Sequence, residues 1–204
     1  MIPELGHFAM ILALLLAIVQ GTLPIVGAHK GMREWMAVAR PAAFGQAFFV
    51  TFAWGCLVWS FTQNDFSVIY VAQNSNTLLP MAYKVAASWG SHEGSLLLWV
   101  LMLAWWTFAV SVLSKHLPEE MMARVIGVQG LISFGFLLFM LTTSDPFDRL
   151  FPAAADGRDQ NPLLQDPAMV IHPPLIYLGY GGFAVAFSFA IAATASSVAF
   201  GQTA

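Results

Sequence analysis

Two short segments of the sequence gather residue types that can do chemistry. The first is WGSHEGS at residues 89–95, in which two glycines flank a His-Glu pair, with Trp99 close behind. Glycine permits a tight turn or a close backbone approach, and tryptophan is common where helices meet a membrane surface. The segment is therefore either an interfacial turn with tryptophan anchors, or a surface holding a flat aromatic ligand or a partner through Trp89, His92, Glu93 and Trp99.

The second segment is centred on His172, which is followed directly by Pro173 and Pro174. Because a proline pair restricts the backbone, we expect these residues to form a stiff entry to the next apolar block, with His172 just before it. A neutral imidazole is a good axial ligand for haem iron. His172 is therefore either a haem ligand or an ordinary loop histidine.

Other familiar chemical motifs are absent from the sequence. It has no GxSxG, Walker, HExxH or GxGxxG pattern. The single cysteine, Cys56, lies in an apolar block and cannot form an internal disulfide or a CxxC site. A net charge of −3 without a basic arm does not suggest a nucleic-acid partner.

The elements that must position these residues are membrane spans. Only 9% of the 204 residues are charged and 58% are hydrophobic, whereas soluble domains carry about 25% charged residues. Each apolar block approaches the roughly 20 residues that cross a bilayer. The sequence therefore predicts an all-α polytopic bundle with five spans, at about 8–26, 41–61, 96–113, 122–143 and 175–200.

The loops predict how these spans are oriented, because cytoplasmic loops are enriched in lysine and arginine. The long stretches at 63–95 and 144–174 would share one side and hold Lys84, Arg149 and Arg158. The short connections hold five such residues: Lys30, Arg33, Arg40, Lys115 and Arg124. We therefore expect the short connections inside, with the N-terminus and both long stretches outside.

The first outer stretch has two local patterns. Residues 66–71 are rich in β-branched and aromatic residues, which favours a short strand. From Met81 to His92, apolar and polar residues each recur every four positions, which predicts an amphipathic helix lying at the membrane surface.

Three segments of the sequence resemble one family. Residues 84–99 (KVAASWGSHEGSLLLW), 168–175 (AMVIHPPL) and the opening IPELG resemble the CcmF family, in order along the chain. CcmF is the membrane haem lyase subunit of bacterial cytochrome c maturation, and the NrfE proteins of nitrite-reductase assembly look similar. His172 matches the family's first periplasmic haem-ligand histidine.

The resemblance implies a role in the bacterial inner membrane. CcmF-type proteins receive haem from the chaperone CcmE and, with CcmH/CcmI-type subunits, join its vinyl groups to the CxxCH cysteines of apocytochrome c. By that resemblance His172 would hold haem iron at the periplasmic face, and residues 89–99 would line or support the haem and partner surface. Membrane lipid and the remainder of CcmF would be further partners.

The chain also departs from the family. It lacks the tryptophan-rich WWD segment, a second periplasmic histidine and the mid-span histidines of a resident haem b. The resemblance therefore implies an N-terminal part that is inactive alone. One alternative is a scaffold that docks the partners without touching haem. Another is a transporter or respiratory subunit, which the lack of charges deep inside the spans disfavours.

Overall fold

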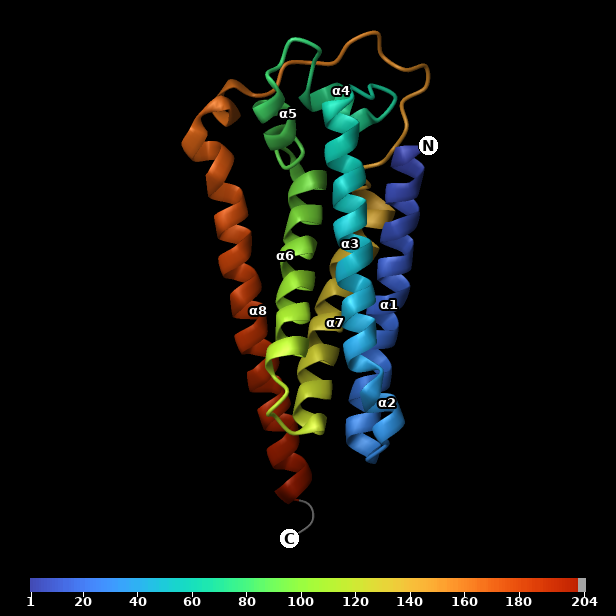
Figure 1. Ribbon diagram of the computed structural model, residues 1–204, viewed down its shortest axis with the longest axis vertical. Helices are drawn as coiled ribbons and strands as arrows, with labels where there is room; N and C mark the ends of the chain where they lie inside the picture. The colour runs from blue at the N-terminus through green and yellow to red at the C-terminus, as the bar shows by residue number, and fades with distance from the viewer. Residues whose placement is uncertain (202–204) are drawn as a thin grey trace.

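The computed structural model describes the backbone of residues 1–201 and the side chains of residues 1–196. It is a helical bundle, and five of its helices or helix pairs are long and apolar enough to span a membrane (Figure 1). The long helices are α1 (Ile2–Lys30), α3 (Ala39–Thr62), α6 (His92–Leu113), α7 (Glu119–Thr143) and α8 (Pro167–Gly201). The short ones are α2 (Arg33–Ala37), α4 (Ile69–Asn74), α5 (Met81–Ala87) and the 3₁₀ turn η1 (Pro162–Gln165). The predicted five-span, all-α architecture is confirmed.

The two ends of the bundle differ in what they carry. The N-terminus, α4, α5 and the first turns of α8 lie at one end, which we call the upper end; α2 and the α6–α7 turn lie at the lower end (Figure 1). Both predicted outer stretches are therefore at the same end of the bundle.

Helices α1, α3 and α7 pack closely because α1 presents small residues to its neighbours. Ala9, Ala13, Ala17 and Gly21 recur every four residues and are all buried. A Cβ atom on Gly130 of α7 would lie only 2.8 Å from the Gly21 amide nitrogen. Small residues in this pattern let helix backbones touch, so this side of the bundle is a rigid support.

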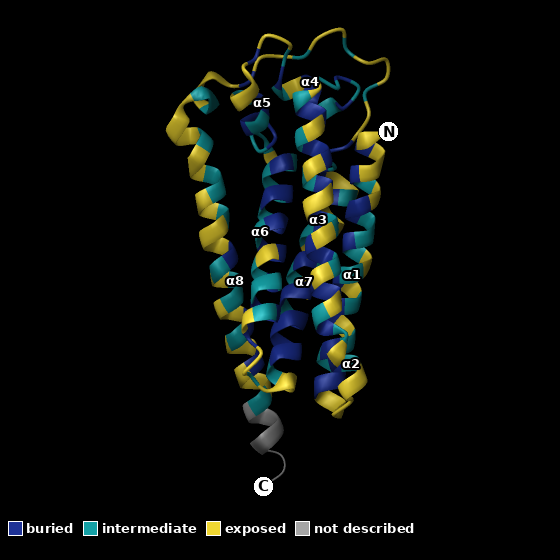
Figure 2. Ribbon diagram, viewed as in Figure 1, coloured by how far each residue is buried: buried dark blue, intermediate teal, exposed yellow. Residues whose placement is uncertain are grey.

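Helix α8 is the most exposed of the long helices. Exposed and partly exposed residues run along most of its described length (Figure 2). It is tied to the bundle by the Trp106 indole Nε1, which donates to the Leu178 carbonyl at 2.9 Å. Near the lower end, Arg124 Nη1 donates to Ser196 Oγ at 2.7 Å. These polar contacts supplement the thinner apolar packing of α8.

The strand predicted at residues 66–71 is wrong. Only Val68 forms a single antiparallel bridge, with Arg149, and α4 begins at the next residue, Ile69. The described residues contain no strand with which this segment could pair. A helix, in contrast, satisfies its own backbone N–H and C=O groups internally. Tertiary context therefore overrides the β-propensity of this stretch.

The fifth helix begins earlier than predicted, so His172 and the two prolines lie inside α8. Asp166 starts the helix, because its Oδ1 accepts a hydrogen bond from the Ala168 amide at 2.8 Å. Pro167 then occupies the first helical position, where a missing N–H costs nothing. The first turns of α8 bend away from the axis of the rest of the helix (Figure 1), as prolines within a helix favour.

Helix α5 covers only the first part of the helix predicted from Met81 to His92, because it ends at Ala87 and His92 already belongs to α6; its polar face is buried. Lys84 is only 5% exposed, and its Nζ donates to Asn64 Oδ1 at 2.6 Å. Ser88 is fully buried, whereas Met81 is 57% exposed. The polar stripe therefore faces the protein and packs α5 onto the bundle.

Candidate functional site

The turn that precedes α6 is held from inside by the phenol of Tyr70. Tyr70 Oη donates to the Ala87 carbonyl at 3.1 Å and accepts from the Ser91 amide at 3.2 Å. Its ring is 2% exposed and meets Phe61 edge-on. Burial raises the pKa of this phenol well above its ordinary value, so it stays neutral and can donate. Tyr70 lies in the stretch predicted to be a strand, and no motif in the sequence marks it as a site residue.

Gly94 confirms the close backbone approach expected of the glycines in this motif. A Cβ atom there would lie 1.9 Å from the Ser88 carbonyl oxygen and 2.5 Å from Tyr70 Oη. No side chain fits at those distances. The glycine thus lets the start of α6 pack directly against the turn that Tyr70 holds.

His92 and Glu93 open α6 at the upper end of the bundle. His92 Nδ1 lies 2.7 Å from Ser144 Oγ, beyond the end of α7, and its Nε2 lies 3.5 Å from Glu93 Oε1. The other carboxylate oxygen, Glu93 Oε2, is buried and has no hydrogen-bond partner among the described residues. The imidazole is therefore oriented by a hydroxyl on one side and a carboxylate on the other.

Next to this pair, the end of α7 is tied to α1. The Asp145 carboxylate contacts His7 Nδ1. Burial raises the pKa of the Asp145 carboxyl group, and the neighbouring His7 partly offsets this increase. Consecutive residues, Ser144 and Asp145, thus bind histidines from two different helices, a pairing that the sequence does not signal.

Trp89 lies against the bundle and reaches α8. Its ring stacks on Trp54 with centroids 6.1 Å apart, and its Nε1 donates to the Val170 carbonyl at 3.2 Å. The contact joins the motif turn to α8 two residues before His172. Trp89 is therefore a bridging side chain rather than an open platform.

Trp99 makes a second bridge to α8, one that is wholly aromatic. It stacks on Tyr177 at 5.7 Å between centroids with an interplanar angle of 18°. Phe136 and Tyr180 lie at 5.0 and 5.9 Å. Such ring pairs add about 0.5–1.5 kcal/mol each beyond their buried area. Within this chain, Trp99 is covered by protein rings on several sides.

His172 differs from the other predicted site histidine, His92, in its partners: His92 is also exposed but contacts Ser144 and Glu93. The His172 side chain is exposed and has no hydrogen-bond or ionic partner among the described residues. Its backbone is nevertheless held between the Trp89–Val170 hydrogen bond and the Trp99–Tyr177 stack. The structure therefore brings the two predicted motifs together, with a fixed backbone and a free imidazole.

The surroundings of His172 suit an apolar ring system with a metal at its centre. Met169, Ile171 and Leu175 are 42%, 58% and 61% exposed on the same helical turns. Across the described part of the chain, no three His, Cys, Asp or Glu side chains gather to hold a bare metal ion. A single imidazole among apolar side chains fits haem, which brings its own four nitrogen ligands.

The chain resembles known proteins of cytochrome c assembly. A family model described as cytochrome C assembly protein matches residues 89–200. The chain is 63% identical to the cytochrome c-type biogenesis protein CcmF of Pseudomonas aeruginosa over 194 residues, which cover 95% of this chain and 30% of that protein. The figures for CcmF of Escherichia coli are 51% over 197 residues, 96% and 30%. NrfE of Haemophilus influenzae is 42% identical over 193 residues, which cover 95% and 30%.

A solved structure gives the same answer. The structure titled cytochrome c heme lyase CcmF superposes with a TM-score of 0.85 and 28% identity, covering 97% of this chain and 31% of that one. The chain thus spans about 30% of the length of the relatives it matches. The family match extends over both motifs and the helices that carry them. The chain therefore belongs to the cytochrome c assembly protein family, with the CcmF proteins of cytochrome c biogenesis.

Proposed function

We propose that this chain is the haem-holding N-terminal part of a membrane haem lyase. His172 would be an axial ligand of the haem iron while the haem is attached to a CxxCH apocytochrome. The observation that carries the proposal is the exposed, unpartnered imidazole of His172 on a backbone fixed at Val170 and Tyr177. Membership of a cytochrome c assembly family supports it independently.

Haem supplies the iron and the vinyl groups that react, and the chain supplies position. His172 would fix the distance of the iron from α8, while Met169, Ile171 and Leu175 would cover one side of the macrocycle. The His92–Glu93 pair lies at the same end of the bundle, at the start of α6. Trp89, in the turn before α6, and Trp99, within α6, both contact α8. The role of the His92–Glu93 pair would be to support this surface, with the rest of the lyase supplying further ligands.

The charge distribution supports a proposed location for this surface. The connections at the lower end, with the helix residues beside them, carry five lysines and arginines, against three in the long upper stretches. By the positive-inside rule, the upper end would lie at the periplasmic face of the bacterial inner membrane. There the chaperone CcmE would deliver haem, and CcmH/CcmI-type subunits would present the apocytochrome.

The test is His172→Ala in the complete lyase complex, with His116→Ala as the matched control. His116 is an exposed histidine in the α6–α7 connection at the opposite end of the bundle. We expect His172→Ala to lose the spectrum of imidazole-ligated haem and most of the cytochrome c yield, and added imidazole to restore part of the spectrum. Unchanged haem binding and yield would refute the ligand assignment.

A second candidate is a docking scaffold that does not contact haem. It is favoured by Trp89 and Trp99, whose rings already stack on Trp54 and Tyr177 within this chain. Photocrosslinkers placed in the 144–174 loop would then capture partner subunits while His172→Ala left the haem spectrum unchanged. Capture together with a lost spectrum would leave the haem-holding function in place.

A further inference from the structure

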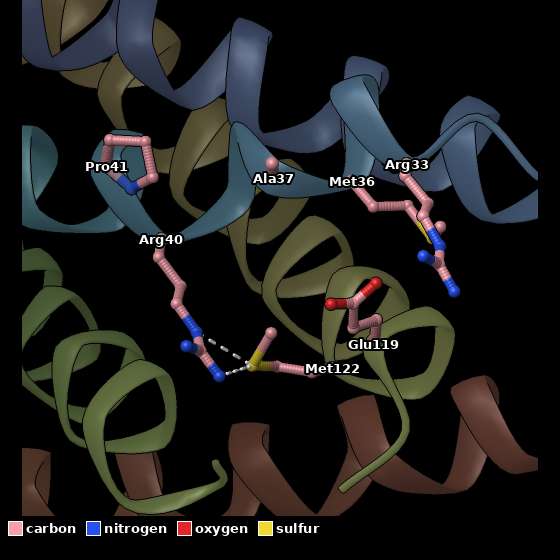
Figure 3. A pocket seen from close by; sticks show the side chains of 7 residues that line it. All are labelled: Arg33, Met36, Ala37, Arg40, Pro41, Glu119 and Met122. Carbon is pink, nitrogen blue, oxygen red and sulfur yellow. Dashed lines mark hydrogen bonds between the residues drawn. The ribbon is translucent and has the colours of Figure 1, made fainter.

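The lower end of the bundle contains a pocket unrelated to the haem site. It lies between α2, the start of α3 and the first turns of α7, and has a volume of about 440 Å³. Arg40 reaches from α3 towards Met122 of α7, while Arg33 and Glu119 line the other side (Figure 3). The pocket therefore has two guanidinium groups and one carboxylate on its walls.

The two guanidinium groups are poorly satisfied. Arg40 Nε and Nη2 donate only to the Met122 sulfur, at 3.2 and 3.1 Å, and a thioether is a weak acceptor. In the part of the chain with described side chains, neither Arg40 nor Arg33 has an oxygen partner within bonding distance. Both retain donors for a phosphate, which guanidinium groups bind in a bidentate manner.

The charged residues that line this pocket give it a net positive charge. Glu120 lies 3.8 Å from Arg124, which balances that pair. Glu119 is thus the single carboxylate set against Arg33 and Arg40 on the pocket walls. The pocket also lies at the N-terminus of α7, a 25-residue helix whose dipole favours anions.

An apolar track leads away from the pocket along α3. Phe44, Phe48 and Phe52 follow Arg40 at four-residue intervals, and they are 44%, 62% and 44% exposed. Figure 2 shows exposed residues recurring along α3. A ligand that combined an anionic head with long apolar chains would contact both the arginines and the phenylalanines.

We propose that this pocket binds the phosphate headgroup of an anionic phospholipid. Arg33 and Arg40 hold the phosphate, and the acyl chains lie along Phe44, Phe48 and Phe52. Basic pockets between transmembrane helices are suited to such headgroups. A free phosphate ion would contact the two arginines but not the phenylalanines. Contact with the phenylalanines therefore distinguishes a phospholipid from free phosphate.

Native mass spectrometry of the delipidated protein in detergent tests the site. Phosphatidylglycerol and phosphatidylcholine with matched acyl chains are titrated into the wild type, R33Q/R40Q and the control K30Q/K115Q. The control removes the same charge from exposed residues at the same end, outside the pocket. We expect preferential binding of phosphatidylglycerol, weakened about fivefold per arginine in R33Q/R40Q and little changed in K30Q/K115Q.

A second measurement needs no variant. Photoactivatable phosphatidylglycerol, with the reactive group on its acyl chain, should label residues 36–52 of the wild type, and inorganic phosphate in excess should not abolish the labelling. Equal binding of both lipids, equal weakening in both variants, or labelling confined to other segments would overturn the proposal. Complete displacement by inorganic phosphate would assign the pocket to a free anion and overturn the lipid as its occupant.

Discussion

The segment from Trp89 to Trp99 and the first turns of α8 each present a histidine at the upper end, but they are built in opposite ways. His92 contacts Ser144 and Glu93, and its turn is fixed by Tyr70 and Gly94. His172 makes no hydrogen bond or ion pair with the described side chains, although its helix is held on either side by Trp89 and Trp99. The segment whose histidine has polar partners suits support, and the segment whose histidine has none suits binding.

The comparison also explains why the two segments must lie together. Helix α8 has little buried surface of its own at the upper end, so its position there depends on the contacts that Trp89 and Trp99 make. A rigid segment from Trp89 to Trp99 would let the exposed His172 side chain keep a defined position relative to its surroundings. Disturbing the segment from Trp89 to Trp99 should therefore affect His172 at a distance, whereas removing the His172 ring should leave that segment intact.

The largest expected effect comes from Gly94→Ala, which disrupts the packing of the segment from Trp89 to Trp99. The added Cβ would meet a backbone oxygen at 1.9 Å, and such overpacking costs about 3 kcal/mol. The control is Gly179→Ala in α8, where a Cβ meets no atom within 4 Å. The single buried Cys56 allows thermal unfolding to be followed with a thiol-reactive fluorogenic dye. Similar midpoints for the two variants would contradict the packing described for Gly94.

Tyr70→Phe should have a smaller effect, because it removes hydrogen bonds but keeps the ring. The Ala87 carbonyl and the Ser91 amide would lose their buried partner, at a cost of about 1–3 kcal/mol. Tyr180→Phe, at a 56% exposed tyrosine on α8, is the matched control and should be nearly silent. If Tyr70→Phe were equally silent in the same unfolding assay, the phenol would not hold the turn.

The sequence predicted the parts of this comparison that depend on composition and local pattern. Hydropathy located the five spans, and the two glycines indicated a close approach that Gly94 makes. The Asp166-Pro167 pair is an N-cap followed by proline at the first helical position. This local pattern indicates that α8 begins at Pro167, whereas the more conspicuous Pro173-Pro174 pair favours a later start.

The parts it could not predict depend on residues far apart in the chain. Tyr70 is 21 residues from Ser91, and Ser144 is 52 residues from His92; neither spacing follows a helical or strand repeat. The exposure of His172 depends on how α8 lies against α6, which no local pattern encodes. Packing of distant segments also decided that residues 69–74 form a helix.

The smallest expected effect is the one that distinguishes the two histidines most sharply. His92→Ala removes the contact with Ser144 and should cost about 1 kcal/mol, whereas His172→Ala removes no internal contact and should stay within about 0.5 kcal/mol. Both variants are measured by the same Cys56 assay in the absence of haem. A His172→Ala midpoint lowered as far as that of His92→Ala would mean that the imidazole has a structural partner in the folded protein. An unchanged midpoint, combined with a lost haem spectrum in the complete complex, would separate binding from folding at this position.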